Sequence, residues 1–140
     1  MDNQHKPQSL KYLQQKIREF IWERDWLKYH SPKNISMSIA IEAAELMEHF
    51  QWLGADESKE LLRDKNKRVE IEDELADIAI YILDFCEHFG VDLEKSILSK
   101  LDKTAKKYPV RLVKGKAHKY TYYTKKGRTV SRGDFLKNPP

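Results

Sequence analysis

One segment, residues 68–89, constrains the fold of this chain more than any other. Successive residues of a helix turn by about 100°, and on that wheel apolar side chains fill most of the circumference of this segment. A helix that is apolar nearly all round is buried in a bundle or in an interface between subunits. The remaining narrow stripe carries Glu74, Asp77, Tyr81 and Asp84. The segment therefore predicts a helical protein with acids placed inside an apolar layer.

The rest of the first 110 residues is also helical by its apolar spacing. Pro32 disfavours helix at the residue before it, so Ser31–Asn34 should separate the first helix from the second. Asp56 and Asp92 are candidate N-caps, and Gly90 is the expected C-terminal end of the long helix. Signals for strands are almost absent before residue 110, which predicts an all-α bundle. The expected helices are residues 8–30, 35–53, 57–63, 68–89 and 93–107.

Charge divides the chain into two predicted regions, a helical domain over residues 1–110 and a basic C-terminal tail over residues 111–140. The tail holds nine Lys or Arg residues and one acid, Asp134, whereas the rest of the chain is mildly acidic. Its sequence fits either a short hairpin around Lys126-Gly127 or an extended arm. A basic tail suggests a polyanionic ligand or partner.

The second predicted helix repeats the acidic stripe, with Glu42 and Glu45 one turn apart and apolar residues on both flanks. Carboxylates are costly to bury without a cation. Two such pairs on facing helices, Glu42 with Glu45 and Glu74 with Asp77, would form an oxygen-rich site that suits Mg²⁺, with Mn²⁺ as an alternative. No His follows a Glu at the Glu-x-x-His spacing of di-iron bundles. The alternative interpretation is a solvated polar stripe.

Aromatic and basic residues accompany the acids. Trp52 and Tyr81 adjoin the stripes, where an aromatic ring can stack on a nucleobase, although packing in the core is the plainer explanation. Lys100 and Lys103, one turn apart on the last predicted helix, can hold phosphates as point charges. Since Mg²⁺ usually bridges to substrate phosphates, the expected substrate is a phosphate ester or anhydride.

Several ordered motifs resemble the MazG-like all-α nucleoside triphosphate pyrophosphohydrolases, and most of all their compact dCTP pyrophosphatase-like group. The resemblance implies a four-helix core assembled as a homodimer or homotetramer with active sites at subunit contacts. It also implies Mg²⁺-dependent cleavage of a nucleoside triphosphate to a monophosphate and pyrophosphate. The motifs are Glu42-Ala43-Ala44-Glu45-Leu46, His49-Phe50-Gln51-Trp52, Glu74-Leu75-Ala76-Asp77 with Tyr81, Gly90-Val91-Asp92-Leu93 and Lys106-Lys107-Tyr108-Pro109-Val110.

The resemblance also implies roles for single residues. Lys100 falls on a phosphate-contacting position, and Thr104 stands where the family often has Asn, which would alter a sugar or phosphate contact. Ile17 stands where some members have a His in the base pocket. The metal-binding and catalytic positions are Glu42, Glu45, Glu74 and Asp77, and the positions lining the base pocket are Trp26, Trp52 and Tyr81.

Two other functions remain open from the residues alone. One is a nucleic-acid-binding helical protein that uses the basic tail, and the other is a non-catalytic helical oligomer. The first leaves the acidic stripes unexplained, and the second predicts that no Mg²⁺ binds. The single cysteine, Cys86, excludes an intrachain disulfide, and residues 1–10 lack the apolar core of a signal peptide. We therefore expect a cytoplasmic protein.

Overall fold

The computed structural model describes residues 9–122, which form helices, turns and loops and contain no strand. The predicted all-α class is therefore confirmed. The chain divides between residues 93 and 94 into two compact units, which are described separately. Within the described residues, no helix has both the length and the apolar character needed to cross a membrane. The division after residue 110, which rests on charge, stays a prediction.

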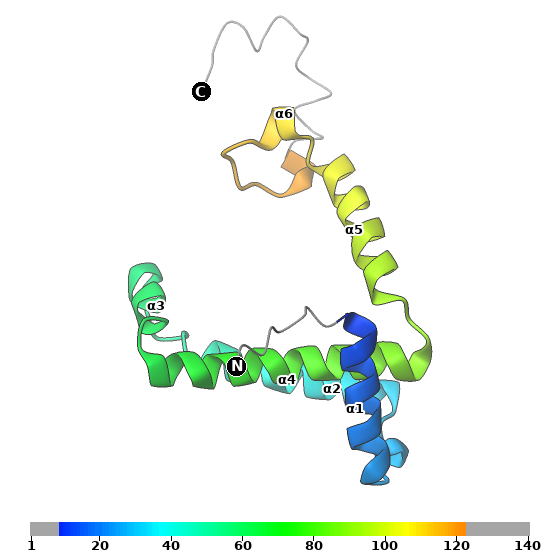
Figure 1. Cartoon of the computed structure of the whole chain (residues 1–140). Helices are drawn as coiled ribbons and strands as arrows, with labels where there is room; N and C mark the ends of the chain where they lie inside the picture. Colours follow the sequence, from blue (N-terminus) through cyan, green and yellow to red (C-terminus); the bar gives the residue numbers. More distant parts are fainter. Residues whose placement is uncertain (1–8, 123–140) are drawn as a thin grey trace, which may run out of the picture. The chain divides into compact units, whose positions relative to one another are not determined.

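The first unit is built around one long helix, α4 (Figure 1). Helix α2 lies along α4, and α1 packs across α4. The short helix α3 lies between α2 and α4 in the chain. The buried core is drawn from α1, α2 and α4 and consists of Ile21, Ile35, Ile71, Leu83 and Cys86. The elements are α1 (Leu10–Glu23), the 3-10 turn η1 (Leu27–Tyr29), α2 (Pro32–Glu48), α3 (Ala55–Leu61) and α4 (Lys65–Phe89).

The first predicted helix is shorter than expected, because it ends at Glu23 instead of continuing to residue 30. Asp25 adopts a left-handed backbone conformation with φ of 53°, which Asp tolerates better than most residues. Its N–H donates to the carbonyl of Trp22. The chain then turns, and the N–H of Trp26 bonds back to the carbonyl of Ile21. This turn brings Trp26 back towards α1.

The predicted break at Ser31–Asn34 is present, but α2 begins at Pro32 and not at residue 35. The hydroxyl of Ser31 accepts a hydrogen bond from the N–H of Asn34 and caps the helix. Proline is well suited to the first helical position, since its fixed φ is helical and its missing N–H is not needed there. The helix ends at Glu48, five residues before the predicted end.

The next two helices also begin earlier than predicted. Asp56 was the predicted cap of α3, but the cap is Gly54, whose N–H donates to the Glu57 carboxylate at 2.7 Å. Asp56 lies in the first turn and forms an ion pair with Lys59. Helix α4 begins at Lys65 because Asp64 accepts hydrogen bonds from two N–H groups of its first turn. The predicted end at Gly90 is confirmed, with φ of 66°.

The second unit contains α5 (Leu93–Lys107), apart from its first residue, and the short helix α6 (Val110–Val113). The chain beyond α6 returns to α5, where the N–H of Tyr120 donates to the Tyr108 hydroxyl at 3.3 Å. Lys107 lies over the Tyr120 ring at 5.1 Å. Residues 120–122 are helical. The remainder of the hairpin considered for the tail lies outside the described residues.

Candidate functional site

Three predicted metal ligands come together between α2 and α4. Glu42, Glu45 and Glu74 each offer one carboxylate oxygen, and these oxygens all lie within 4.8 Å of one another. Glu42 and Glu45 are one turn apart on α2, and Glu74 reaches them from α4. The packing of α2 along α4 therefore converts two separate sequence motifs into one acidic cluster.

The electrostatics of this acidic cluster reflect the crowding of like charges. Burial raises the pKa of the Glu42 carboxyl, and the nearby carboxylates of Glu45, Asp77 and Glu74 raise this pKa further. Asp77 thus acts on Glu42, although it is not one of the three residues whose oxygens lie within 4.8 Å of one another. An all-oxygen, negatively charged donor set is what Mg²⁺ and Mn²⁺ prefer, so the residues present fit a hard divalent cation.

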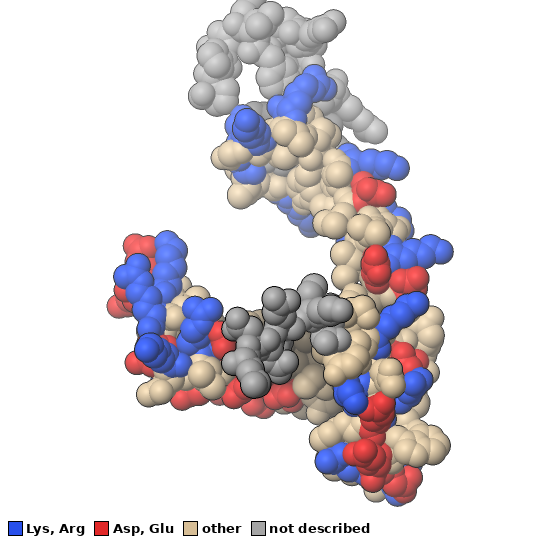
Figure 2. All heavy atoms as spheres, in the orientation of Figure 1, with Lys and Arg blue, Asp and Glu red and all other residues tan. Residues whose placement is uncertain are grey.

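An open hollow of about 460 Å³ adjoins the acidic cluster and is lined in part by Glu45 and Glu74. Lys67, from the first turn of α4, lines the same hollow and forms an ion pair with Glu70 at 2.6 Å. Figure 2 shows the wider charge pattern, in which acidic side chains form a row along the packed helices α2 and α4, and side chains of both charges lie over α3. The hollow is therefore lined both by acids of the cluster and by one positively charged side chain.

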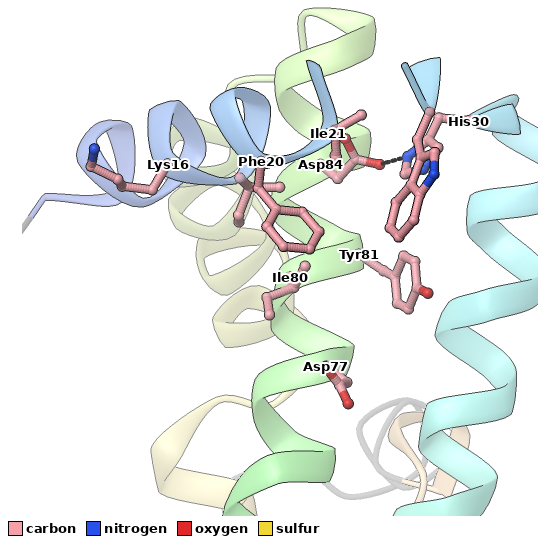
Figure 3. A pocket seen from close by; sticks show the side chains of 10 residues that line it. Lys16, Phe20, Ile21, His30, Asp77, Ile80, Tyr81 and Asp84 are labelled. Atoms are coloured by element: carbon pink, nitrogen blue, oxygen red, sulfur yellow. Dashed lines mark hydrogen bonds and ion pairs between the residues drawn. The ribbon is translucent and has the colours of Figure 1, made fainter. Parts of the chain in front are cut away.

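A second pocket, of about 400 Å³, lies between α1, the turn that follows it and α4 (Figure 3). It is mostly apolar and has aromatic walls. Trp26 packs edge-on against Phe20, with ring centroids 5.8 Å apart. The guanidinium of Arg24 lies over the Phe20 ring, 3.7 Å from its centroid. The residues that line the pocket are Lys16, Ile17, Phe20, Ile21, Trp26, His30, Asp77, Ile80, Tyr81 and Asp84.

Asp77 connects the apolar pocket to the acidic cluster. Its side chain lines the pocket, and its charge raises the pKa of Glu42 in the cluster. An aromatic group therefore finds matching walls on one side of Asp77, whereas a polyanionic group would be repelled by the acids on the other side unless a cation lay between them. Apolar walls with a few placed polar groups are typical of small-molecule sites.

The polar pair at the other end of the pocket was not predicted from the sequence. Nδ1 of His30 lies 2.7 Å from Oδ2 of Asp84, and both side chains are largely buried. Asp84 stood out only as a member of the acidic stripe. Its pairing with His30, 54 residues away, has no signal in the local spacing. Phe20 and Ile80 are further pocket residues that the sequence did not single out as functional.

The structure brings some predicted site residues together and leaves others apart. Trp26, Tyr81 and Asp77 share the apolar pocket, and Ile17 lines it as well. Trp52 is 87% exposed and belongs to neither the pocket nor the hollow. Lys100 and Thr104 lie on α5 in the second unit. The functional roles of all these residues stay predictions.

Comparisons with known proteins agree with this architecture. The model of the MazG-like family matches residues 37–122. The dCTP pyrophosphatase 1 proteins of Bos taurus and Homo sapiens are 38% and 35% identical over 103 residues. These alignments cover 74% of this chain and 61% of each relative, so the chain spans less than two thirds of their length.

A solved structure, that of a pyrophosphatase from Archaeoglobus fulgidus, is similar over nearly its whole length. Its TM-score is 0.69 at 39% sequence identity, and the match covers 77% of this chain and 99% of the archaeal chain. The fold and the acidic cluster thus define an all-α protein with carboxylates between two packed helices. The chain belongs to the MazG-like family.

Proposed function

We propose that this protein is a divalent-metal-dependent nucleoside triphosphate pyrophosphohydrolase, with dCTP or a related nucleotide as the candidate substrate. One observation carries the proposal: Asp77 joins a three-carboxylate cluster to a pocket walled by aromatic rings. A nucleoside triphosphate has a flat base at one end and a polyanionic chain at the other. The names of the relatives, dCTP pyrophosphatase 1 and pyrophosphatase, support this substrate class.

Glu42, Glu45 and Glu74, together with Asp77, would hold the metal, for which we propose Mg²⁺ with Mn²⁺ as a substitute. Their all-carboxylate donor set and the raised pKa of Glu42 support a site that gains from a cation. When bound, such a cation supplies positive charge that stabilises the negative charge developing on phosphate oxygens.

The protein's own residues would bind the substrate and move one proton. Trp26 and Tyr81 would hold the base within the apolar pocket. As the oxygen of water bonds to phosphorus, the bond to the pyrophosphate oxygen breaks, and a carboxylate of the acidic cluster accepts the proton of the water. Lys100 and Thr104 would contact the phosphates or the sugar, and Trp52 would contact the base.

We also propose that the protein works as a homodimer or homotetramer. Helix α2 leaves an apolar stripe uncovered in the single chain, in which Ile41 is 52% exposed and Met37 is similarly accessible. Large uncovered apolar surfaces on one helix are typical of subunit contacts. The buried, unpaired thiol of Cys86 fits a reducing compartment, and a cytoplasmic location is part of the proposal. Nucleic-acid binding by residues 111–140 is the alternative function and is not part of this proposal.

The proposal is tested by measuring pyrophosphate release from each dNTP and NTP in the presence of Mg²⁺. Glu45→Gln removes one charge from the acidic cluster at nearly constant size, and we expect it to abolish this release while the helical circular dichroism spectrum is kept. Glu72→Gln is the matched control, since Glu72 lies on α4 in an exposed ion pair with Arg68. Unchanged turnover by Glu45→Gln would contradict the site, and no turnover of any triphosphate by the native protein would contradict the function.

A further inference from the structure

Lys67 lines the open hollow at the end of it that is farther from the aromatic pocket along α4. Lys67 and Glu74 both line the hollow, and their spacing of seven residues places them on one face of α4, about 10 Å apart along its axis. Asp77, which lines the aromatic pocket, lies one turn beyond Glu74 in the opposite direction. Helix α4 therefore presents, in order, the aromatic pocket, the acidic cluster and the hollow with Lys67.

This order matches the order of groups in a nucleoside triphosphate. The base, the sugar and the three phosphates follow one another in a single chain, and the second and third phosphates leave together as pyrophosphate. A substrate with its base in the aromatic pocket and its first phosphate at the acidic cluster would extend its outer phosphates along α4, past Glu74 and into the hollow.

The side chain of Lys67 can donate to a ligand in the hollow. It is 47% exposed, and its ion pair with Glu70 uses one of the three hydrogens of the ammonium group. An ion pair this exposed stabilises the fold little, so a phosphate can share or replace it. The backbone N–H groups of Asn66 and Lys67 are already bonded to Asp64. The ammonium group, and not the start of the helix, is therefore the part of this turn that can hold an anion.

The acids of the hollow show why a positive side chain is needed there. Glu45, Glu48 and Glu74 line the hollow and would repel a phosphate. A cation at the acidic cluster would offset Glu45 and Glu74, but Glu48 does not belong to the cluster. Among the described residues, Lys67 is the only lysine or arginine that lines this hollow, and His49 is its remaining titratable group.

We infer that Lys67 binds the terminal phosphates of the substrate and that the hollow is the subsite for the leaving pyrophosphate. This inference rests on the proposed function, since it takes the bound chain to be a triphosphate. When the bond between the first and second phosphates breaks, its electron pair stays on the oxygen of the pyrophosphate. The oxygen of water forms the new bond to the first phosphorus, and its proton goes to a carboxylate of the acidic cluster. The ammonium group of Lys67 stabilises the negative charge that develops on the pyrophosphate.

Calorimetric binding of inorganic pyrophosphate to the full chain in excess Mg²⁺ tests this subsite without turnover. Lys67→Gln should raise the Kd for pyrophosphate at least about tenfold, because it removes a charge-assisted hydrogen bond. Its Kd for dCMP should stay unchanged, since a monophosphate does not reach the hollow. Lys65→Gln is the matched control: it removes the same charge from the same turn of α4, but Lys65 does not line the hollow. Lys67→Arg keeps the charge and should restore most of the pyrophosphate binding.

Steady-state kinetics and thermal denaturation give two further readouts. With dCTP, Lys67→Gln should lower kcat/KM at least about tenfold and weaken product inhibition by pyrophosphate, whereas Lys65→Gln should do neither. The rise in melting temperature on adding Mg²⁺ should be the same in both variants. A loss of this rise in Lys67→Gln would assign Lys67 to the metal site and overturn the inference.

The outcomes separate the subsite from the proposed function. Equal pyrophosphate affinity in Lys67→Gln and Lys65→Gln would overturn the inference, and so would a native protein that hydrolyses dCTP without binding pyrophosphate. A native protein that binds pyrophosphate through Lys67 but hydrolyses no triphosphate would support the subsite and contradict the proposed function alone.

Discussion

The carboxylates of Glu45 on α2 and Glu74 on α4 approach within 4.8 Å of each other through their oxygens, although the residues belong to different motifs. Two negative charges at that separation repel each other. The packing of α2 along α4, which is the main helix contact of the first unit, therefore includes an unfavourable interaction. A cation between the helices would remove the repulsion and add a bond to each helix, so metal binding and stability should be coupled.

The first prediction concerns this coupling. A divalent cation at the acidic cluster should raise the melting temperature of the native protein by several degrees over that in chelator, because a ligand at 100 times its Kd adds about 2.7 kcal/mol to the free energy of unfolding. Glu74→Gln should lose most of this rise, and Glu72→Gln should keep it. Thermal denaturation in EDTA and in Mg²⁺ measures both. An equal rise in Glu74→Gln and the native protein would contradict the cluster as the metal site.

The second prediction follows from the raised pKa of Glu42. When the pH rises above 4.5, the ordinary pKa of this carboxyl, the group keeps its proton to a higher pH in the folded protein than in the unfolded chain. The folded state therefore binds more protons in that window, and its stability falls as the pH rises from 4.5 through the raised pKa. In chelator, Glu42→Gln should thus gain stability over the native protein as the pH rises through this range. Urea unfolding at a series of pH values measures the difference, and a constant difference would contradict it.

The acidic cluster could be predicted because its information is local. The pairs Glu42 with Glu45 and Glu74 with Asp77 are each one turn apart on one helix, and the apolar flanks indicate which face each pair occupies. Facing helices then follow from the bundle. The helix ends were less predictable: Ser31 and Asp64 cap α2 and α4 and place their starts nearer the N-terminus, and such capping bonds compete closely with other start positions.

The aromatic pocket could be predicted only in part, because it depends on contacts between distant segments. Trp26 reaches the pocket through the left-handed conformation of Asp25, which Asp tolerates but does not require. His30 meets Asp84 because the 3-10 turn lies beside α4, and this long-range packing leaves no periodic signal in one sequence. Trp52 was placed with Trp26 only through the resemblance, and within the single chain it lies outside the pocket.

The third prediction separates two tryptophans that are four residues apart. Trp26 lines the aromatic pocket, whereas Trp22 is 71% exposed and lies outside it. If the pocket holds the base, Trp26→Ala should raise KM for the nucleotide about tenfold or more, given about 1–3 kcal/mol for stacking of one base. Trp22→Ala should change KM little. Steady-state kinetics of both variants measure this, and similar effects in the two would place the base elsewhere.

The fourth prediction compares two apolar residues on one helix. Ile71 is 3% exposed between α4 and its neighbours, and Val69 on the same helix is 55% exposed. Ile71→Ala should lower the free energy of unfolding by about 2–5 kcal/mol, through lost burial and the cavity that remains. Val69→Ala should cost clearly less in the isolated chain. Urea denaturation of the two variants gives the comparison, and a reversed order would contradict the assigned core.

The fifth prediction concerns the uncovered stripe of α2. Ile41 and Glu45 both lie on α2, which supplies acids to the acidic cluster and leaves the apolar Ile41 side chain exposed. If that stripe forms a subunit contact, Ile41→Glu places an unpaired charge in an apolar interface, which is strongly unfavourable. We expect analytical ultracentrifugation to show a smaller species for Ile41→Glu than for the native protein.

Lys65→Glu introduces the same acid in the exposed first turn of α4, so it serves as the control and should leave the assembly intact. A native protein that sediments as a monomer at all concentrations would contradict the proposed oligomer, whereas an unchanged oligomer in Ile41→Glu would move the interface to another face. Because α2 also carries Glu42 and Glu45, dissociation should weaken metal binding as well, and the two losses are expected to follow the same dependence on protein concentration.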